Sequence, residues 1–347
     1  RAFMTFSSMF DDGFPPPGRF GPRAIRSIDA FAAALDETRA RGWGMSYEEA
    51  ERGIAAIAAP IRPSGPNTPA VATCSVAGPV MRFGADEPLM MDAGIALAPW
   101  QIAYQTYGTL NAAKDNAIVY PTWYSGRHWD NEWLIGEGMA LDPGSYFIIV
   151  PNMLGNGLSS SPSNTPPPYD RARFPKVTVL DNVTVQHRLV SEHFGIEQLE
   201  LVTGWSMGAG QTYQWAVSYP DMVKRMLPFC GSSKTSEHNI VFLEGVKAAL
   251  TADDAWNHGW YEEQPAKGLR AAARVYAGWG FSQAFYWDQV YKEMGYSSLE
   301  DFLVGFWEGF FLDGRDANNL LTMLWTWQNG DIGKTPGFDG DHGKALQ

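Results

Sequence analysis

The stretch from Leu199 to Gly210 limits what this chain can fold into more than any other part of it. It begins with apolar residues of strand type, continues with Gly-x-Ser-x-Gly around Ser206, and leads into a helical pattern that ends at Tyr219. In a strand–turn–helix of this kind the turn is so tight that the flanking positions, here Gly204 and Gly208, must be small. The serine then stands exposed at the carboxyl end of the strand. We therefore expect Ser206 to be a nucleophile, with a purely structural turn as the alternative.

A nucleophilic serine needs hydrogen-bond donors for the negative charge that develops on its substrate. The first predicted donor is the backbone amide of Met207, which directly follows the serine. The second should come from the loop Thr-Trp-Tyr-Ser-Gly after a short apolar run that ends at Pro121. There we expect the amide of Tyr124 to donate, with that of Trp123 as the alternative. Three nearby side chains are expected to line the substrate pocket: Trp123, Trp205 and His128.

Composition and charge exclude several other classes of protein. A net charge of -12 argues against nucleic-acid binding, which needs clustered Lys and Arg. The two cysteines, Cys74 and Cys230, form neither a disulfide framework nor a zinc-binding spacing, and we expect no metal and no cofactor. No apolar stretch is long enough to cross a bilayer and no signal peptide is visible. The sequence thus predicts a soluble, cytoplasmic protein that does not bind membranes.

Residues 1–82 differ in pattern from the rest of the chain and predict a small α+β fragment. A short helical piece is expected at Arg1–Phe6, and a longer helix at Ala24–Gly42, where apolar residues recur at helical spacing. Two strand-like runs follow, Ile54–Ile61 and Ala70–Val76, with a Pro-Ser-Gly-Pro turn between them.

From residue 83 onward strands alternate with helices, which predicts an α/β fold: a parallel sheet with helices on both faces. The predicted strands are a hairpin within Ile95–Gly108, then Asn116–Pro121, Tyr146–Pro151, Leu199–Gly204 and Met222–Cys230. Helices are expected at Trp129–Ala140 and, with Asp181 as its cap, at Asn182–Phe194. Residues 236–327 are helical in pattern and rich in tryptophan, and we expect a lid there that forms an apolar pocket over the sheet.

The first part of the chain resembles the second half of the effector-binding domain of IclR-type transcription regulators. The resemblance rests on Arg-Ala-Arg-Gly-Trp at 39–43, Glu-Glu-Ala-Glu-Arg-Gly-Ile at 48–54, Ala-Ile-Ala-Ala-Pro-Ile at 56–61 and Ser-Val-Ala-Gly-Pro at 75–79. The first half of that domain and a winged helix-turn-helix are missing, so a DNA-binding regulator is not expected. We interpret residues 1–82 as a fragment that packs on its neighbour or makes a homodimer; a working sensor is the alternative.

Residues 83–347 resemble the homoserine O-acetyltransferase family of α/β-hydrolases. Matching segments, in order, are Ala-Tyr-Gln-Thr-Tyr-Gly-Thr-Leu-Asn at 103–111, residues 174–183, the elbow region 204–221, and Gly-Asp-Ile at 330–332. The resemblance implies an α/β-hydrolase sheet with a helical lid. Two departures stand beside the nucleophile: Trp123-Tyr124 replaces the transferases' Ala-Leu, and Trp205 replaces a glycine. These changes resemble the branch of the family that hydrolyses small esters.

The resemblance also implies a catalytic acid and a base, in the chain order Ser, then Asp or Glu, then His. Family members continue with a strand that bears the acid and a loop that bears the histidine, and this sequence stops short of both. Asp341 and His342 do not match those two residues. We therefore expect weak catalysis from this chain alone. Besides His342, the histidines that remain as candidates for a base are His128, His187, His193, His238 and His258.

Three functions are consistent with these observations. The expected one is the hydrolysis of short-chain carboxylic esters through an acyl-enzyme on Ser206, with a small-molecule ester as the partner. The second is an acyl-CoA-dependent O-acyltransferase, in which an alcohol replaces water and acyl-CoA is a co-substrate. The third is a non-catalytic fusion that binds a small molecule or dimerises. An activity that survives in Ser206→Ala would favour the third over the other two.

Overall fold

The computed structural model describes residues 28–41, 44–47, 54–61, 72–84 and 86–347. Two compact units follow one another along the chain, residues 1–82 and residues 83–347. The division falls where the sequence pattern changes from the small α+β fragment to alternating strands and helices. The helical piece that the sequence predicts at Arg1–Phe6 lies outside the described residues.

The described part of the first unit contains one helix and a three-stranded antiparallel sheet. Helix α1 spans Ile28–Arg41, within the range predicted for it. Strand β2 (Ile54–Ile61) has the predicted bounds and pairs with both β1 (Gly44–Tyr47) and β3 (Ala72–Phe83). Strand β3 continues well beyond the predicted end. Strand β1 is missed by sequence reasoning because its four residues include Gly and Ser and lack a β-branched run.

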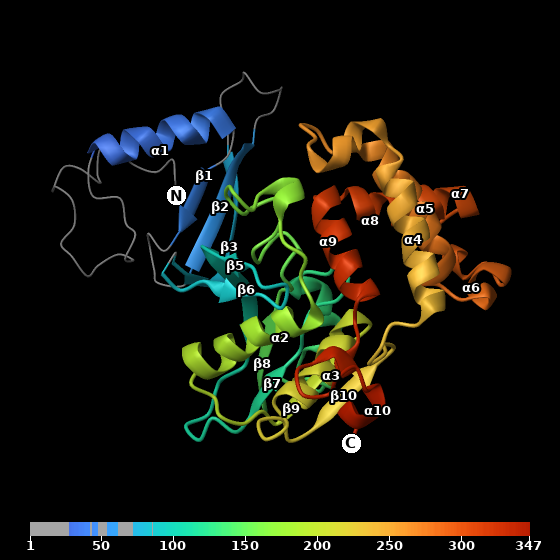
Figure 1. The fold of residues 1–347 in the computed structure, drawn as a ribbon. Helices are drawn as coiled ribbons and strands as arrows, with labels where there is room; N and C mark the ends of the chain where they lie inside the picture. Colours follow the sequence, from blue (N-terminus) through green and yellow to red (C-terminus); the bar gives the residue numbers. More distant parts are fainter. Residues whose placement is uncertain (1–27, 42–43, 48–53, 62–71, 85) are drawn as a thin grey trace. The chain divides into compact units, whose positions relative to one another are not determined.

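The second unit is built on a mainly parallel sheet, as the sequence predicts (Figure 1). Its strands follow the order β6-β8-β7-β9-β10, in which β6 is antiparallel to β8 and the other pairs are parallel. A separate small hairpin pairs β4 with β5, so the hairpin predicted within Ile95–Gly108 is wrong: its two strands have different partners. The strands are β4 (Leu89–Met90), β5 (Ala96–Leu97), β6 (Trp100–Tyr107), β7 (Ala117–Val119), β8 (Phe147–Pro151), β9 (Leu201–Trp205) and β10 (Met226–Phe229).

The register of the sheet brings two loops together. Strand β7 lies between β8 and β9, and Val119 near its end faces Ile149 on one side and Val202 on the other. Because parallel strands end at the same edge of a sheet, the loop after β7 and the turn after β9 begin side by side. The predicted nucleophile and the predicted oxyanion loop therefore share the carboxyl edge of the sheet.

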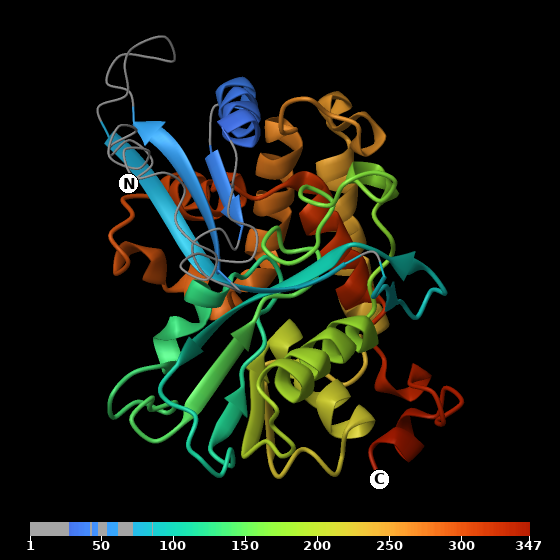
Figure 2. The same ribbon diagram turned by 90° about the vertical axis from the view of Figure 1, so that its left-hand side faces the viewer.

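Helices α2 (Val179–Arg188) and α3 (Met207–Ser218) pack against each other, and α3 packs on β9 and β10 (Figure 2). A short irregular segment also packs on the sheet. An apolar cluster joins Ile118, Tyr120 and Ile148, in or next to the sheet, to Leu134 and Leu141. These last two residues belong to a 3₁₀ helix and the loop after it, so a short irregular segment packs there.

The remaining helices form a lid, as the composition of residues 236–327 predicts. In Figure 1 the helices α4, α5, α8 and α9 lie together, apart from the sheet strands β7–β10. Their aromatic and aliphatic side chains form one buried cluster that also includes Tyr124 and Met207. The bounds are α4 (Glu237–Thr251), α5 (Ala266–Gly280), α6 (Gln283–Trp287), α7 (Leu299–Phe302), α8 (Gly309–Leu312) and α9 (Ala317–Gln328), followed by α10 (His342–Ala345).

Two predicted helices differ from the structure. The helix expected at Trp129–Ala140 is a 3₁₀ helix that ends at Leu134. Two glycines follow it, and Gly138 adopts a φ of 71°, which an α-helix does not accommodate.

The helix expected at Asn182–Phe194 begins earlier, at Val179, and continues from Leu189 to His193 as a π-helical turn. Its cap is Thr178 rather than Asp181: the Thr178 hydroxyl accepts from the Asp181 amide, and the Asp181 carboxylate accepts from the Thr178 amide. Sequence reasoning placed the cap three residues late because both residue types favour that position.

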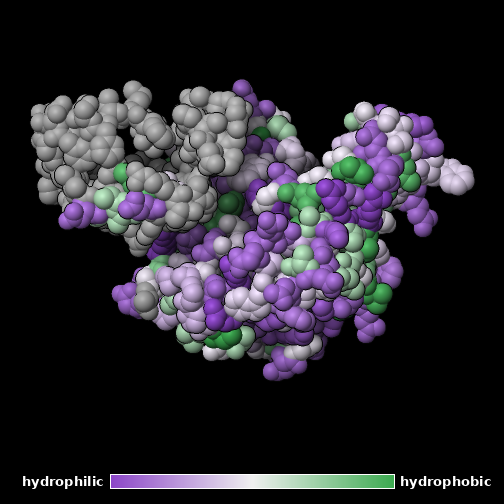
Figure 3. Space-filling model, turned by 90° about the horizontal axis from the view of Figure 1, so that it is seen from above, coloured by the Kyte–Doolittle hydropathy of each residue, from purple (hydrophilic) through white to green (hydrophobic). Residues whose placement is uncertain are grey.

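Among the described residues, no helix is both long and apolar enough to cross a membrane. Figure 3 shows one face of the molecule, on which hydrophobic and hydrophilic residues are interspersed.

Candidate active site

Ser206 occupies a strained turn between β9 and α3. Its φ of 55° and ψ of -125° lie in a region that residues with a side chain rarely adopt. The backbone is held there because the Ser206 amide donates to the Phe229 carbonyl, 3.1 Å away, on the neighbouring strand. The side chain is partly exposed and makes no hydrogen bond within the described part of the chain. A hydroxyl held in this way is free to meet a substrate.

Gly204 and Gly208 must be glycine because backbone atoms lie where their Cβ atoms would be. A Cβ atom on Gly204 would lie well inside 3.0 Å of the backbone carbon and oxygen of Gly208, a separation that real Cβ atoms do not reach. A Cβ atom on Gly208 would lie 2.8 Å from the carbonyl oxygen of Pro121. The first turn of α3 thus lies directly against the end of β9 and the start of the loop after β7.

The loop after β7 forms a tight turn that directs an amide outward. The Gly126 amide donates to the Trp123 carbonyl at 2.9 Å, and Ser125 has a φ of 61°, as the third residue of a type II turn does. In a planar trans peptide the C=O and N–H groups point in opposite directions. Because the Trp123 carbonyl faces into the turn, the Tyr124 N–H points out of the turn.

The predicted oxyanion donors are available. Within the described residues, the backbone N–H groups of Trp123, Tyr124 and Met207 donate to no acceptor. Unpaired amides at a loop next to a helix start are a suitable arrangement for an anionic oxygen. The structure therefore leaves both amides proposed for the second donor position, Tyr124 and Trp123, open.

Large aromatic rings surround these groups. The indoles of Trp123 and Trp205 meet edge to face with ring centroids 5.1 Å apart, and Trp123 stacks on Phe310 of the lid at 6.2 Å. Tyr124 is buried and stacks on Tyr276 of the lid at 5.6 Å. Burial raises the pKa of the Tyr124 hydroxyl well above its ordinary value, so the side chain stays neutral. Aromatic side chains of the loop after β7, of β9 and of the lid therefore pack together beside Ser206.

His128 lies at the start of the 3₁₀ helix and is held by Asn152. The Asn152 side chain accepts from the His128 amide at 3.0 Å, and its Nδ2 lies 3.0 Å from the His128 Nδ1. An amide nitrogen only donates, so Nδ1 accepts and the ring proton is assigned to Nε2. Burial lowers the pKa of His128. His128 makes no hydrogen bond to Ser206.

The other five histidines are engaged elsewhere, and none is hydrogen-bonded to Ser206. Two are hydrogen-bonded: His342 to the Ser233 hydroxyl at 2.8 Å, and His193 to the Tyr104 hydroxyl at 2.9 Å. Three contact aromatic rings: His187 with Tyr219, His238 with Trp279, and His258 with Trp256. The structure thus places Ser206 and the loop that carries the predicted second donor at the same edge of the sheet, and none of the six histidines hydrogen-bonds to Ser206.

Three supporting residues were missed by sequence reasoning. Asn152 orients His128, and Arg315 supports the aromatic wall: its guanidinium lies 3.6 Å from the centroid of the Phe310 ring, and burial lowers its pKa to about 10. Gln211 is fully buried beneath the elbow. For Gln211 the sequence signal is a polar residue within a helical pattern, and this signal does not identify the partner.

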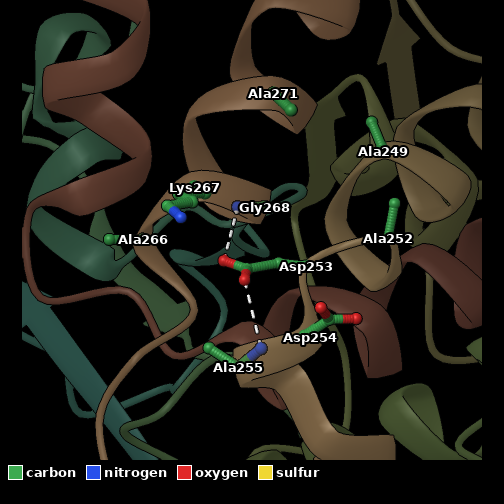
Figure 4. Close-up of a pocket in the computed structure, with 9 residues that line it drawn as sticks. All are labelled: Ala249, Ala252, Asp253, Asp254, Ala255, Ala266, Lys267, Gly268 and Ala271. Carbon is green, nitrogen blue, oxygen red and sulfur yellow. Dashed lines mark hydrogen bonds between the residues drawn. The ribbon is translucent and has the colours of Figure 1, made fainter.

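One surface hollow of the described residues is lined by none of these groups. It has a volume of about 630 Å³ at the corner between α4 and α5, and no predicted site residue lines it (Figure 4). The Asp253 carboxylate in this hollow accepts from the amides of Ala255 and Gly268, so it stabilises the corner. The described residues also contain no group of three His, Cys, Asp or Glu side chains placed to hold a metal ion.

Comparisons with known families match both parts of the chain. The sequence model of the α/β hydrolase fold matches residues 121–295. The model of the C-terminal domain of IclR-type bacterial transcriptional regulators matches residues 18–97, which confirms the resemblance of the first part.

Individual proteins agree with the first of these matches. An ethyl acetate hydrolase of Pseudomonas veronii is 45% identical over 262 residues, which cover 75% of this chain and 74% of the relative. A homoserine O-acetyltransferase of Mesorhizobium japonicum is 43% identical over 219 residues, which cover 57% of this chain and 56% of the relative. The crystal structure of the acetyl esterase MekB superposes with a TM-score of 0.74 at 44% identity, covering 78% of this chain and 77% of the esterase.

Proposed function

The chain belongs to the α/β-hydrolase fold family, and from that premise we propose that it hydrolyses short-chain carboxylic esters with Ser206 as the nucleophile. The observation that carries the proposal is the strained backbone of Ser206 between two unpaired amides. Strain of this kind costs of order 1–3 kcal/mol and persists where the surroundings enforce it, often at functional sites.

In the proposed mechanism the Ser206 oxygen attacks the ester carbonyl carbon. The carbonyl oxygen becomes negatively charged and accepts hydrogen bonds from the amides of Met207 and Tyr124. Collapse of this intermediate breaks the ester C–O bond; the proton lost by the Ser206 hydroxyl passes through solvent to the leaving oxygen, which departs as the alcohol, and the acyl group stays on Ser206. A water molecule then attacks the acyl-enzyme through the same kind of intermediate and releases the carboxylic acid. Each oxyanion donor of this type contributes a factor of about 10²–10³ to the rate.

The aromatic walls favour a small acyl group. Trp123 and Trp205 contact each other beside the nucleophile, and Trp123 is fixed from the other side by Phe310. Rigid rings on this side leave room for few carbon atoms, and overfilling such a pocket is costly. The names of the relatives, an ethyl acetate hydrolase and an acetyl esterase, point to the same substrate class. We therefore expect acetate and other short esters to be preferred over long ones.

A base that takes the proton of the nucleophile usually accelerates the first step. Since none of the six histidines hydrogen-bonds to Ser206 here, we expect the rate acceleration to come from the oxyanion donors and from substrate binding. We therefore expect the 347-residue chain to hydrolyse esters by attack of Ser206, but more slowly than a serine hydrolase whose nucleophile is hydrogen-bonded to a base.

Acyl transfer is the second candidate, because the curated relatives include homoserine O-acetyltransferases. It uses the same acyl-enzyme and differs only in the acceptor. The esterase relative matches a larger share of this chain, 75% against 57%, which favours water as the acceptor.

The test measures the hydrolysis of p-nitrophenyl acetate and p-nitrophenyl octanoate by the wild-type chain and by Ser206→Ala. We expect hydrolysis of the acetate above the buffer rate, much slower hydrolysis of the octanoate, and no hydrolysis above buffer in the variant. Equal rates in wild type and variant would refute Ser206 as the nucleophile. A parallel incubation with acetyl-CoA and homoserine tests transfer: O-acetylhomoserine formed faster than free acetate would replace hydrolysis by the transferase activity.

A further inference from the structure

We propose that Gln211 is a positioning residue that holds the two halves of the oxyanion hole in register, an inference that rests on the proposed function. The Gln211 side chain lies on α3 and is fully buried. Its Nε2 donates to the Thr122 carbonyl at 2.8 Å and to the Met207 carbonyl at 3.2 Å. One amide group thus bridges the loop after β7 and the first residue of α3.

The two carbonyls belong to the segments that carry the predicted donors. Thr122 directly precedes Trp123 and Tyr124 in the loop, and Met207 supplies the other amide. The Thr122 C=O shares a planar peptide with the N–H of Trp123, the alternative second donor, so fixing this carbonyl fixes that N–H and the start of the turn that carries the Tyr124 N–H. A change at Gln211 therefore alters the orientation of the loop relative to the helix without touching the substrate.

The orientation of the Gln211 amide is itself determined. The Trp215 Nε1 donates to the Gln186 Oε1 at 2.8 Å, and the Gln186 Nε2 donates to the Gln211 Oε1 at 2.6 Å. This series of hydrogen bonds begins at the Trp215 indole, which only donates, and ends at the two backbone carbonyls, which only accept. Both amides therefore have one orientation that satisfies every partner. Gln186 and Trp215 are fully buried as well, so water does not compete for these hydrogen bonds.

These contacts run from α2 through α3 to the oxyanion loop, and nothing in the proposed reaction uses them chemically. In a buried site, satisfied polar chains of this kind fix a unique geometry. Their loss leaves the donors present but poorly aligned. Because a misplacement of about 1 Å costs on the order of 100-fold in rate, we expect a smaller, partial loss of about 10- to 100-fold for Gln211→Met.

The same helix offers a matched control. Gln214 is also buried, 3% exposed, and its Nε2 donates to the hydroxyls of Ser218 and Thr335 at 2.9 and 2.8 Å, away from the elbow. Gln211→Met and Gln214→Met each remove one buried amide of the same size from α3. Both variants should lose stability, so stability alone cannot distinguish a positioning role from a structural one.

The experiment compares kcat and KM for p-nitrophenyl acetate in wild type, Gln211→Met and Gln214→Met, well below the unfolding temperature of each. We expect kcat to fall by about 10- to 100-fold in Gln211→Met with KM nearly unchanged, and both constants to stay within about 2-fold in Gln214→Met. A wild-type kcat in Gln211→Met, or an equal loss in the two variants, would overturn the inference.

Amide hydrogen exchange of the loop at residues 122–126 gives a readout that does not depend on catalysis. Exchange there should be faster in Gln211→Met than in wild type and unchanged in Gln214→Met. Unchanged exchange in Gln211→Met would overturn the positioning role even if esters are hydrolysed. Faster exchange in a protein without Ser206-dependent hydrolysis would instead retain the structural link and refute the proposed function.

Discussion

Replacing Gly204 with alanine tests why the residue two positions before the nucleophile is small. The added Cβ atom would lie well inside 3.0 Å of the backbone carbon and oxygen of Gly208. Both are backbone atoms of the first turn of α3, so the clash is relieved only if the start of the helix moves. Ser206 lies between the two glycines and would move with it. Overpacking of this kind typically costs about 1–3 kcal/mol.

The effect on catalysis should be about as large in free energy as the effect on stability, because 100-fold in rate corresponds to about 2.7 kcal/mol. A shift of about 1 Å at a reacting group costs on the order of 100-fold in rate, and Ser206 must stay aligned with amides on two different segments. We therefore expect Gly204→Ala to lower kcat for p-nitrophenyl acetate by about 100-fold while the protein remains folded.

Gly210→Ala, two residues beyond the motif, is the matched control. The nearest atom to a Cβ at this position is the Ser232 carbonyl oxygen at 3.6 Å, an ordinary contact. Gly210 lies inside α3, where glycine is about 1 kcal/mol less favourable than alanine. This variant should therefore be more stable than wild type by about 0.5–1 kcal/mol, with unchanged hydrolysis.

Denaturant unfolding followed by tryptophan fluorescence measures both variants. Trp43 is the only one of the fourteen tryptophans outside residues 83–347, so the signal reports the second unit. With an unchanged slope, the shift of the midpoint gives the change in the free energy of unfolding. The reasoning is refuted if Gly204→Ala is as stable and as active as wild type, or if the two variants shift the midpoint in the same direction.

Two further predictions concern charge. Glu308 is 4% exposed and accepts from Arg270 Nη1 at 2.7 Å and Arg274 Nε at 2.6 Å, so Glu308→Gln should cost about 1–3 kcal/mol in unfolding free energy. Burial opposes ionisation of Glu308, but these two hydrogen bonds outweigh it and lower its pKa; the stabilisation is complete above the ordinary value of 4.5 and is lost as the pH falls. The gap between the unfolding midpoints of wild type and variant should therefore narrow below about pH 4.5, and a constant gap would contradict this assignment. The pKa of His128 is lowered mainly by burial from an ordinary value of 6.5, so the stabilisation it provides is present above that value and is lost on acidification. His128→Gln should lose less stability between about pH 7 and pH 5 than wild type, and an equal decline in the two unfolding midpoints would count against a buried neutral imidazole.

The sequence predicted the features that depend on local residues. The buried strands around Ile148 and Val202, and the turn at Ser206, follow from short apolar runs and two glycines that are neighbours along the chain. The side-by-side position of the oxyanion loop and the elbow could also be predicted, because parallel strands end at one edge of a sheet.

The features that failed depend on contacts between distant residues. A helix after Trp129 is favoured by its amphipathic pattern, but Gly138 and packing on the sheet shorten it. His128 was predicted to line the pocket, and its partner Asn152 lies on another loop that no local pattern links to it. The bond between Gln186 and Gln211 joins two helices, and a buried glutamine in sequence does not reveal which carbonyl it will meet.

The most direct test of the account is to detect the acyl-enzyme. The 347-residue chain is incubated briefly with p-nitrophenyl acetate, quenched with acid, digested and analysed by mass spectrometry, beside Ser206→Ala treated in the same way. The account predicts an added acetyl group on the peptide that contains Ser206 in the wild type, and its absence from the same peptide in the variant. Ester hydrolysis by the wild type without an acetyl group on Ser206, or the same acetylated peptide in both proteins, would contradict it.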